Sequence, residues 1–203
     1  MKAMEDKIRS EAHVLPGEIL LVDAFLNQQV DVALLQTLAD AWYERFGDRK
    51  ITKILTIEAS GIAIASIVAA RFGVPALFAK KYDSHNLTGD RHETVVYSYT
   101  KCKEYTIAVS RRLLTADDHV LIVDDFLANG CALTGLIELV ESAGATVAGI
   151  GIAIEKTFQP GGHMLREKGY EIYSMAQVKR IDVENDTVEF EPVPIIRYDR
   201  PEA

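Results

Sequence analysis

Val120–Ala132 reads VLIVDDFLANGCA, and this stretch decides the fold class. Its first four residues form a continuous apolar run, and His119–Asp124 therefore predicts a strand buried on both faces of a parallel sheet. Two acidic residues, Asp124 and Asp125, follow this run, and the small residues after them lead into a helical pattern. The order of strand, acidic pair, loop and helix indicates an α/β protein whose ligand site lies beyond the carboxyl end of this strand.

Strands and helices alternate on both sides of this stretch. Upstream, Ile51–Glu58 and Ala76–Lys81 predict strands that enclose an alanine-rich helix at Ser60–Phe72. Downstream, a helix at Ala132–Ala143 leads to a buried strand at Thr146–Glu155. Two β-α-β units predict a mostly parallel sheet flanked by helices.

Other segments complete this outline. Asp31–Phe46 predicts an amphipathic helix with Asp31 as its cap. Thr94–Lys101 and Tyr105–Val109 predict an antiparallel pair of strands. Tyr82–Glu93 is polar without apolar periodicity, so we expect an exposed loop long enough to close over a site.

Composition and charge narrow the classes of protein. The 203 residues are 48% hydrophobic and 26% charged, which is typical of one globular domain spanning residues 1–203. A net charge of -8 argues against a nucleic-acid or membrane-surface partner. No signal-peptide pattern or membrane-length apolar run occurs, so we expect a cytoplasmic protein with Cys102 and Cys131 as free thiols.

The loop after the acidic pair has the composition of a phosphate cradle. Backbone N–H groups of the loop and of the helix start can bind a phosphate dianion, and Gly130 permits the close approach. The candidate phosphate ligands are Ala128, Asn129, Gly130, Cys131 and Ala132. Asp124 and Asp125 can accept hydrogen bonds from the vicinal hydroxyls of a ribose whose 5-phosphate lies in the loop. Taken alone, an Asp-Asp pair favours a capped strand-helix junction or a metal site, but the full thirteen-residue pattern with its phosphate-sized loop favours the ribose-phosphate site.

The full pattern resembles the phosphoribosyl pyrophosphate (PRPP) signature of the type I phosphoribosyltransferases. It departs from most of that family at Asn129, where Ser or Thr is usual, and at the bulky Phe126. These departures point to the bacterial xanthine phosphoribosyltransferases, which the chain resembles from about Met4 to about Phe190. The motifs that carry the resemblance are DAFLN at 23–27, TIEASGIA at 56–63, DDFLANG at 124–130 and IEKTFQPG at 154–161. Cys131 stands where a polar residue such as Gln is expected, and it could make the loop oxidisable.

The resemblance implies a fold and an activity. The fold is the type I phosphoribosyltransferase sheet with a small hood formed by residues 1–30 and 157–203. The activity is transfer of the 5-phosphoribosyl group from PRPP to N9 of xanthine in purine salvage, which gives xanthosine 5'-monophosphate and pyrophosphate. A guanine/hypoxanthine or adenine phosphoribosyltransferase, or a regulator that senses PRPP, remains an alternative. The resemblance also implies a homodimer.

The resemblance assigns roles to further residues. Ser60, Gly61 and Lys81 would bind pyrophosphate, with Lys81 reaching across a dimer. From the local sequence alone, Ser60 and Gly61 also fit a plain strand-to-helix turn. Lys81, together with Lys80, also fits a solvated pair of basic residues. Four residues would bind the base: Leu20, Asn27, Lys156 and Phe158. Without the resemblance, Leu20 would be read as core and Asn27 as a loop or cap residue.

Metal ligands and organic cofactors are not indicated by the sequence. The five histidines show no paired ligand spacing, and two cysteines are too few for a zinc site. Mg2+ is expected to arrive with the pyrophosphate and the ribose hydroxyls, because it prefers oxygen ligands and keeps several waters.

Overall fold

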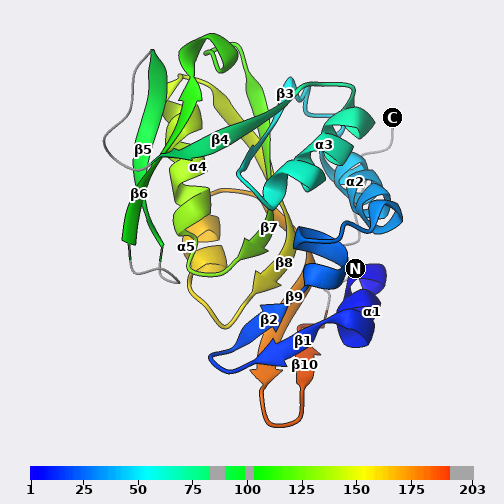
Figure 1. The fold of residues 1–203 in the computed structure, drawn as a ribbon. Coiled ribbons are helices and arrows are strands. Elements are labelled where there is room, and N and C mark those ends of the chain that lie inside the picture. Colours follow the sequence, from blue (N-terminus) through cyan, green and yellow to red (C-terminus); the bar gives the residue numbers. More distant parts are fainter. Residues whose placement is uncertain (83–89, 99–102, 193–203) are drawn as a thin grey trace.

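The strand that carries the acidic pair, β7 (His119–Leu127), lies in the middle of an 8-stranded sheet (Figure 1). The computed structural model describes residues 1–82, 90–98 and 103–192. The remaining strands of this sheet are β3 (Lys53–Ile57), β4 (Ala76–Tyr82), β5 (Arg91–Ser98), β6 (Lys103–Ser110), β8 (Thr146–Lys156), β9 (Ile172–Asp182) and β10 (Thr187–Phe190). Their order is β10-β9-β8-β7-β3-β4-β6-β5, with β9, β8, β7, β3 and β4 parallel and the other strands antiparallel to their neighbours.

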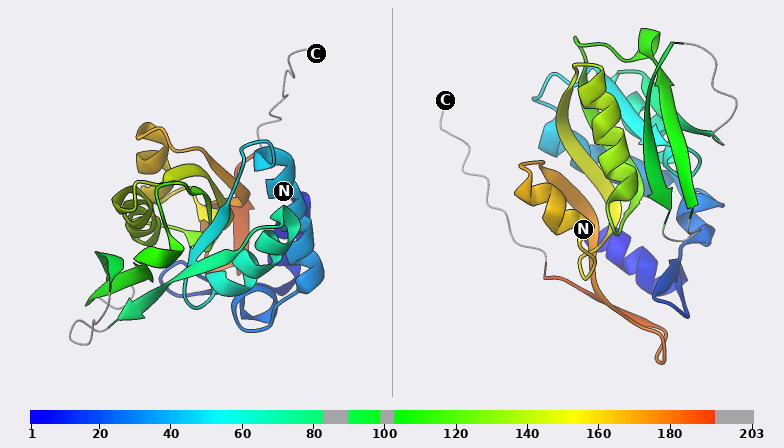
Figure 2. Two further views of the ribbon diagram at one scale, coloured as in Figure 1. Left: turned by 90° about the horizontal axis from the view of Figure 1, so that it is seen from above. Right: turned by 90° about the vertical axis from the view of Figure 1, so that its left-hand side faces the viewer.

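Helices cover both faces of the parallel strands. α2 (Val32–Phe46) and α3 (Gly61–Phe72) pack on one face, and α4 (Cys131–Ser142) packs on the other (Figures 1 and 2). Leu121 and Val123 of β7 belong to the core beneath α2 and α3, whereas Val120 and Ile122 belong to the core beneath α4. Both faces of β7 are thus buried, which is the physical reason for its continuous apolar run.

Two glycines in β8 let α2 approach the sheet closely. A β carbon at Gly149 would lie 2.6 Å from Phe46, and one at Gly151 would lie 2.7 Å from Trp42. The start of α2 is fixed as predicted, because Leu34 N donates to Asp31 Oδ1 at 3.0 Å.

The predicted β-α-β units and the antiparallel pair β5–β6 are confirmed, but several boundaries were wrong. β3 begins at Lys53 rather than Ile51, and β5 begins at Arg91 rather than Thr94, while residues 99–101 of that predicted strand lie outside the described residues. β7 continues past Asp124 to Leu127, because its pairing with β8 extends through Leu127 and Glu155. The predicted loop Tyr82–Glu93 is shorter, since Tyr82 ends β4 and Arg91 begins β5 in strands paired with β6. Residues 83–89 of that loop lie outside the described residues.

The amino-terminal segment lies in the lower part of Figure 1, beside β9 and β10 at one edge of the sheet. It contains α1 (Lys2–Glu11), the hairpin β1 (His13–Leu15) and β2 (Ile19–Leu21), and the π-helical turn η1 (Asp23–Asn27). α1 contacts β9 and β10, and Val14 N donates to Asp186 Oδ1 at 2.8 Å. β9 and β10 lie within the second hood segment, residues 157–203, and they are also strands of the main sheet. The described part of this segment therefore extends the sheet and also contacts the amino-terminal segment.

Two short elements complete the chain: the 3-10 turn η2 (Arg111–Leu113) and α5 (Gly161–Glu167). Among the described helices, none has the length and apolar character needed to cross a bilayer.

Candidate active site

The acidic pair lies near the carboxyl end of β7, within the strand rather than directly after it. Asp124 is 3% exposed, and Asp125 is half-buried. Both carboxylates are held by the backbone of the next residue, with Asp125 N donating to Asp124 Oδ1 at 3.1 Å and Phe126 N donating to Asp125 Oδ1 at 2.9 Å. Because both residues lie near the carboxyl end of β7, their carboxylates reach the edge of the parallel sheet at which ligands bind.

Burial and charge make Asp124 an unusual carboxyl group. Its pKa lies well above its ordinary value, first because burial disfavours the charged form and second because the charge of Asp125 is close. The charge of Lys81 opposes this rise. Asp124 therefore lies within electrostatic reach of a partner acid and a lysine, a combination typical of functional sites.

The loop after β7 forms a small cavity at the start of α4. Gly130 has φ +85°, a left-handed conformation that favours glycine, and immediately precedes the helix. The cavity, of about 170 Å³, is lined by Tyr97, Tyr105, Phe126, Leu127, Ala128, Asn129, Gly130, Cys131, Ala132 and Leu133. It contains all five predicted phosphate ligands, and the amino end of α4 favours an anion there. Burial raises the pKa of Cys131, which keeps its thiol neutral and less reactive.

The turn from β3 to α3 lies against the acidic pair. A β carbon at Gly61 would lie 1.9 Å from Thr56 Oγ1 and 3.0 Å from Asp124 Oδ1, so only glycine lets this turn approach β7. The preceding Glu58–Ala59 peptide is cis, and Glu58 Oε1 accepts a hydrogen bond from Lys81 N at 2.6 Å. The predicted pyrophosphate residues Gly61 and Lys81 are thereby linked to the same region as Asp124.

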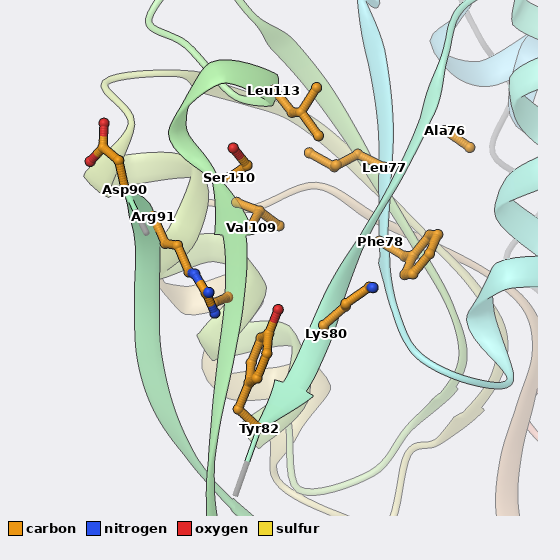
Figure 3. A pocket seen from close by; sticks show the side chains of 11 residues that line it. Ala76, Leu77, Phe78, Lys80, Tyr82, Asp90, Arg91, Val109, Ser110 and Leu113 are labelled. Carbon is orange, nitrogen blue, oxygen red and sulfur yellow. The ribbon is translucent and has the colours of Figure 1, made fainter. Parts of the chain in front are cut away.

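Lys80 and Lys81 face different sides of β4. The Lys81 ammonium lies 5.5 Å from the ring centroid of Tyr105, which lines the phosphate cavity. Lys80 instead lines a separate cavity of about 490 Å³ on the sheet formed by β4, β5 and β6, together with Tyr82 and Arg91 (Figure 3). This larger cavity is lined by neither Asp124 nor Asp125 and by no part of the phosphate loop, so the smaller cavity is the better candidate for the reaction.

The predicted base-binding lysine emerges at the end of β8. Lys156 Nζ donates to the Glu18 carbonyl oxygen at 2.8 Å, in the β1–β2 turn next to Leu20, and lies 5.9 Å from the ring centroid of Phe126. Burial lowers the pKa of Lys156, and the charge of Glu18 opposes that shift. Phe126 thus lies between the phosphate cavity and Lys156.

The other predicted base ligands differ in exposure. Leu20 is buried in β2, whereas Asn27 is exposed at the end of η1. Phe158 is 37% exposed in the turn after β8, which leaves its ring available for stacking.

Three residues near the site were missed by the sequence analysis. Thr56 is fully buried beside Gly61, and its hydroxyl has no hydrogen-bond partner within the described ranges. Gly161 N donates to Ala128 O at 3.0 Å, and the buried carboxylate of Glu155 forms an ion pair with the partly exposed Arg166 on α5. All three residues lie inside motifs that carry the family resemblance, namely Thr56 in 56–63 and Glu155 and Gly161 in 154–161. Their contacts could not be predicted from neighbouring residues in the chain.

The fold and the loop define a class of enzyme, and the comparison with known families agrees. Residues 22–186 match the model described as phosphoribosyl transferase domain, so the chain belongs to the phosphoribosyltransferase family. Adenine phosphoribosyltransferase from Rhodothermus marinus has the same fold, with a TM-score of 0.69 at 21% identity over 88% of this chain and 100% of that chain.

Sequence relatives are more similar and carry a different name. Xanthine phosphoribosyltransferase from Bifidobacterium adolescentis is 58% identical over 191 residues, which cover 94% of this chain and 99% of the relative. Xanthine phosphoribosyltransferase from Finegoldia magna is 50% identical, over 94% of this chain and all of the relative. The predicted family resemblance is confirmed.

Proposed function

We propose that this enzyme transfers the 5-phosphoribosyl group from PRPP to N9 of xanthine, giving xanthosine 5'-monophosphate and pyrophosphate. The observation that carries the transfer is the pair Asp124–Asp125 at the end of β7, two residues before a phosphate-sized loop at the start of α4. The base is inferred from the relatives at 50% to 58% identity, which cover 94% of the chain. The adenine phosphoribosyltransferase neighbour supports the fold but, at 21% identity, not the base.

The acidic pair would act on the ribose. Its carboxylates accept hydrogen bonds from the O2 and O3 hydroxyls, which holds C1 in line with the base nitrogen. As pyrophosphate departs, positive charge develops on the ribose ring, and nearby carboxylates stabilise that charge. The loop N–H groups hold the 5-phosphate, while Ser60, Gly61 and Lys81 hold the departing pyrophosphate.

The residues at the site fit a Mg2+ ion that arrives with the substrate. No group of three or more His, Cys, Asp or Glu side chains placed to hold a metal occurs in the described part of the chain. Asp124 and Asp125 offer carboxylate oxygens, the ligand type that Mg2+ prefers, and PRPP brings the remaining oxygens. When bound, the ion supplies positive charge that offsets the charge of the pyrophosphate.

Lys156 would read the 6-position of the base. Its ammonium carries three donors, of which one is used by the Glu18 carbonyl, so the others remain available to an oxygen acceptor. Phe158 would stack on the ring, Leu20 would pack against it, and the Asn27 amide would donate to the 2-oxygen that distinguishes xanthine from hypoxanthine.

We expect the enzyme to rank xanthine over guanine over hypoxanthine and to leave adenine unused. Adenine presents an amino group to the Lys156 donors, and unpaired donors in a site built for hydrogen bonding cost several kcal/mol, or roughly 10⁴-fold in specificity. The measurement is kcat/KM for each of the four bases with PRPP and Mg2+. Adenine as the best substrate would refute the role of Lys156, and the absence of nucleotide from any base would refute the proposed function.

Asn27→Leu should narrow the difference between xanthine and hypoxanthine. Because hypoxanthine lacks the 2-oxygen, loss of the amide donor should lower kcat/KM for xanthine by about tenfold and leave hypoxanthine within about threefold of the parent. The matched control is Gln28→Leu, which removes the adjacent exposed amide and should not change the ratio. An unchanged xanthine-to-hypoxanthine ratio in Asn27→Leu contradicts the assignment.

Measuring nucleotide formation from the four bases also distinguishes the enzyme from a PRPP-sensing regulator, because a regulator would bind PRPP without forming nucleotide from any base.

The homodimer and the cytoplasmic location remain predictions.

A further inference from the structure

A buried carboxylate lies immediately before the base-binding lysine. The Glu155 side chain is 2% exposed, and Arg166 binds it through two hydrogen bonds, Nη1 to Oε1 at 2.6 Å and Nη2 to Oε2 at 2.7 Å. Burial acts to raise the pKa of Glu155, but hydrogen bonds from Arg166 and then Ser174 outweigh it and lower the pKa. A bidentate pair of this kind fixes the direction as well as the distance between its partners.

The ion pair holds the first turn of α5 against the end of β8. A β carbon at Gly162 would lie 2.0 Å from Glu155 Oε1 and 2.7 Å from Arg166 Nη1. The helix therefore begins directly on the carboxylate, and Arg166, four residues further on, binds the same group. Only glycine leaves room for this arrangement.

The residue before Gly162 contacts the phosphate loop through its backbone. Gly161 N donates to Ala128 O at 3.0 Å, and a β carbon at Gly161 would lie 2.4 Å from Ala128 O and 2.5 Å from Gly130 N. On the same helix, the Met164 side chain lies 3.4 Å from the position of a β carbon at Gly130. The start of α5 thus lies directly against the loop formed by residues 128–130.

We propose that the Glu155–Arg166 pair is a positioning pair for PRPP. By fixing the start of α5, the pair holds Ala128–Gly130 in the shape that binds the 5-phosphate, although neither of its side chains lines the phosphate cavity. This inference rests on the proposed function, because it assumes that this loop binds PRPP. A displacement of about 1 Å in such a loop is enough to lower binding and rate by large factors.

Four variants separate positioning from simple stabilisation. Arg166→Met leaves a buried carboxylate without its charged partner, with hydrogen bonds only from Ser174 and Gln177, and Arg166→Lys keeps the charge but loses the second hydrogen bond. Glu155→Gln/Arg166→Met removes both charges, which should restore much of the lost stability without restoring the bidentate geometry. Glu167→Gln is the matched control, because it changes an exposed carboxylate on the same helix, 67% exposed and paired with His163.

The readouts are the Kd for PRPP by calorimetry with Mg2+, the KM for xanthine, and the unfolding temperature. We expect PRPP binding to weaken by about tenfold or more in Arg166→Met and in the double variant, with Arg166→Lys between them and the parent. The xanthine KM should change less, and Glu167→Gln should match the parent. Parental Kd in the double variant, or a loss confined to xanthine, would overturn the inference; a parent enzyme that does not bind PRPP would instead overturn the proposed function.

Discussion

Asp124→Asn should lose at least about a hundredfold in turnover while folding at least as stably as the parent enzyme. The loss is expected because the carboxylate charge stabilises the positive charge that develops on the ribose, and an amide cannot supply that charge. Asp125→Asn should lose turnover by a similar factor for the same reason. Both substitutions keep the side-chain oxygen that accepts the hydrogen bond from the next backbone N–H.

The stability of Asp124→Asn follows from the pKa of the parent residue. Burial and the charge of Asp125 raise the pKa of Asp124 in the folded protein. A carboxyl group whose pKa is higher in the folded than in the unfolded protein lowers stability at any pH above the unfolded-state pKa. This cost is full above the folded-state pKa, shrinks as the pH falls below it, and is gone below the unfolded-state pKa. Asparagine does not ionise, so near neutral pH the variant should gain about 1 kcal/mol, or about 2–4 °C in Tm.

Steady-state kinetics and thermal unfolding test both expectations on the same samples. The matched control is Asp118→Asn, which changes a buried carboxylate just before β7 that accepts hydrogen bonds from Thr52, Lys53 and the Thr115 backbone. This control should lower stability by about 1–3 kcal/mol and leave kcat nearly unchanged. Near-parental turnover in both Asp124→Asn and Asp125→Asn would contradict the ribose assignment.

Gly130→Val should abolish PRPP binding, with an affinity loss of at least about a hundredfold. Valine is β-branched and resists the left-handed conformation at φ +85°, and its β carbon would lie 3.0 Å from the Gly161 Cα. The backbone must therefore move at the point where phosphate N–H donors are expected. Calorimetric titration with PRPP and Mg2+ measures the effect.

Gly73→Val controls for backbone strain alone. Gly73 ends α3 at φ +69°, also in the left-handed region, but a β carbon there would have nothing within 4 Å. The control should lose stability by about 1–3 kcal/mol and bind PRPP as the parent does. If both glycine variants bound PRPP equally well, the phosphate cradle would be refuted.

Local sequence determined most of the fold. The apolar run of β7 required burial on both faces, Asp31 supplied the cap of α2, and Gly73 allowed α3 to end in a left-handed turn. The loop 128–130 and the acidic pair could also be found, because a phosphate cradle needs small residues in consecutive positions. Such features depend on residues that are close together in the chain, so they can be predicted from the sequence alone. The sequence-based prediction misplaced the end of β7, because pairing with β8 decides where that strand stops. It also made the loop after β4 too long, because pairing with β6 decides where β4 ends and β5 begins.

Contacts between distant segments were decided only by the tertiary structure. Side chains alternate between the two faces along a strand, which predicts that Lys80 and Lys81 point to opposite faces of the sheet. Only the packed sheet places Lys81 near Asp124. Gly61 lies against Asp124, and Gly161 lies against Ala128, because β3, β7 and β8 end at the same edge of a parallel sheet in a particular register. That register is set by side-chain packing over the whole core, which no local segment of the chain encodes by itself.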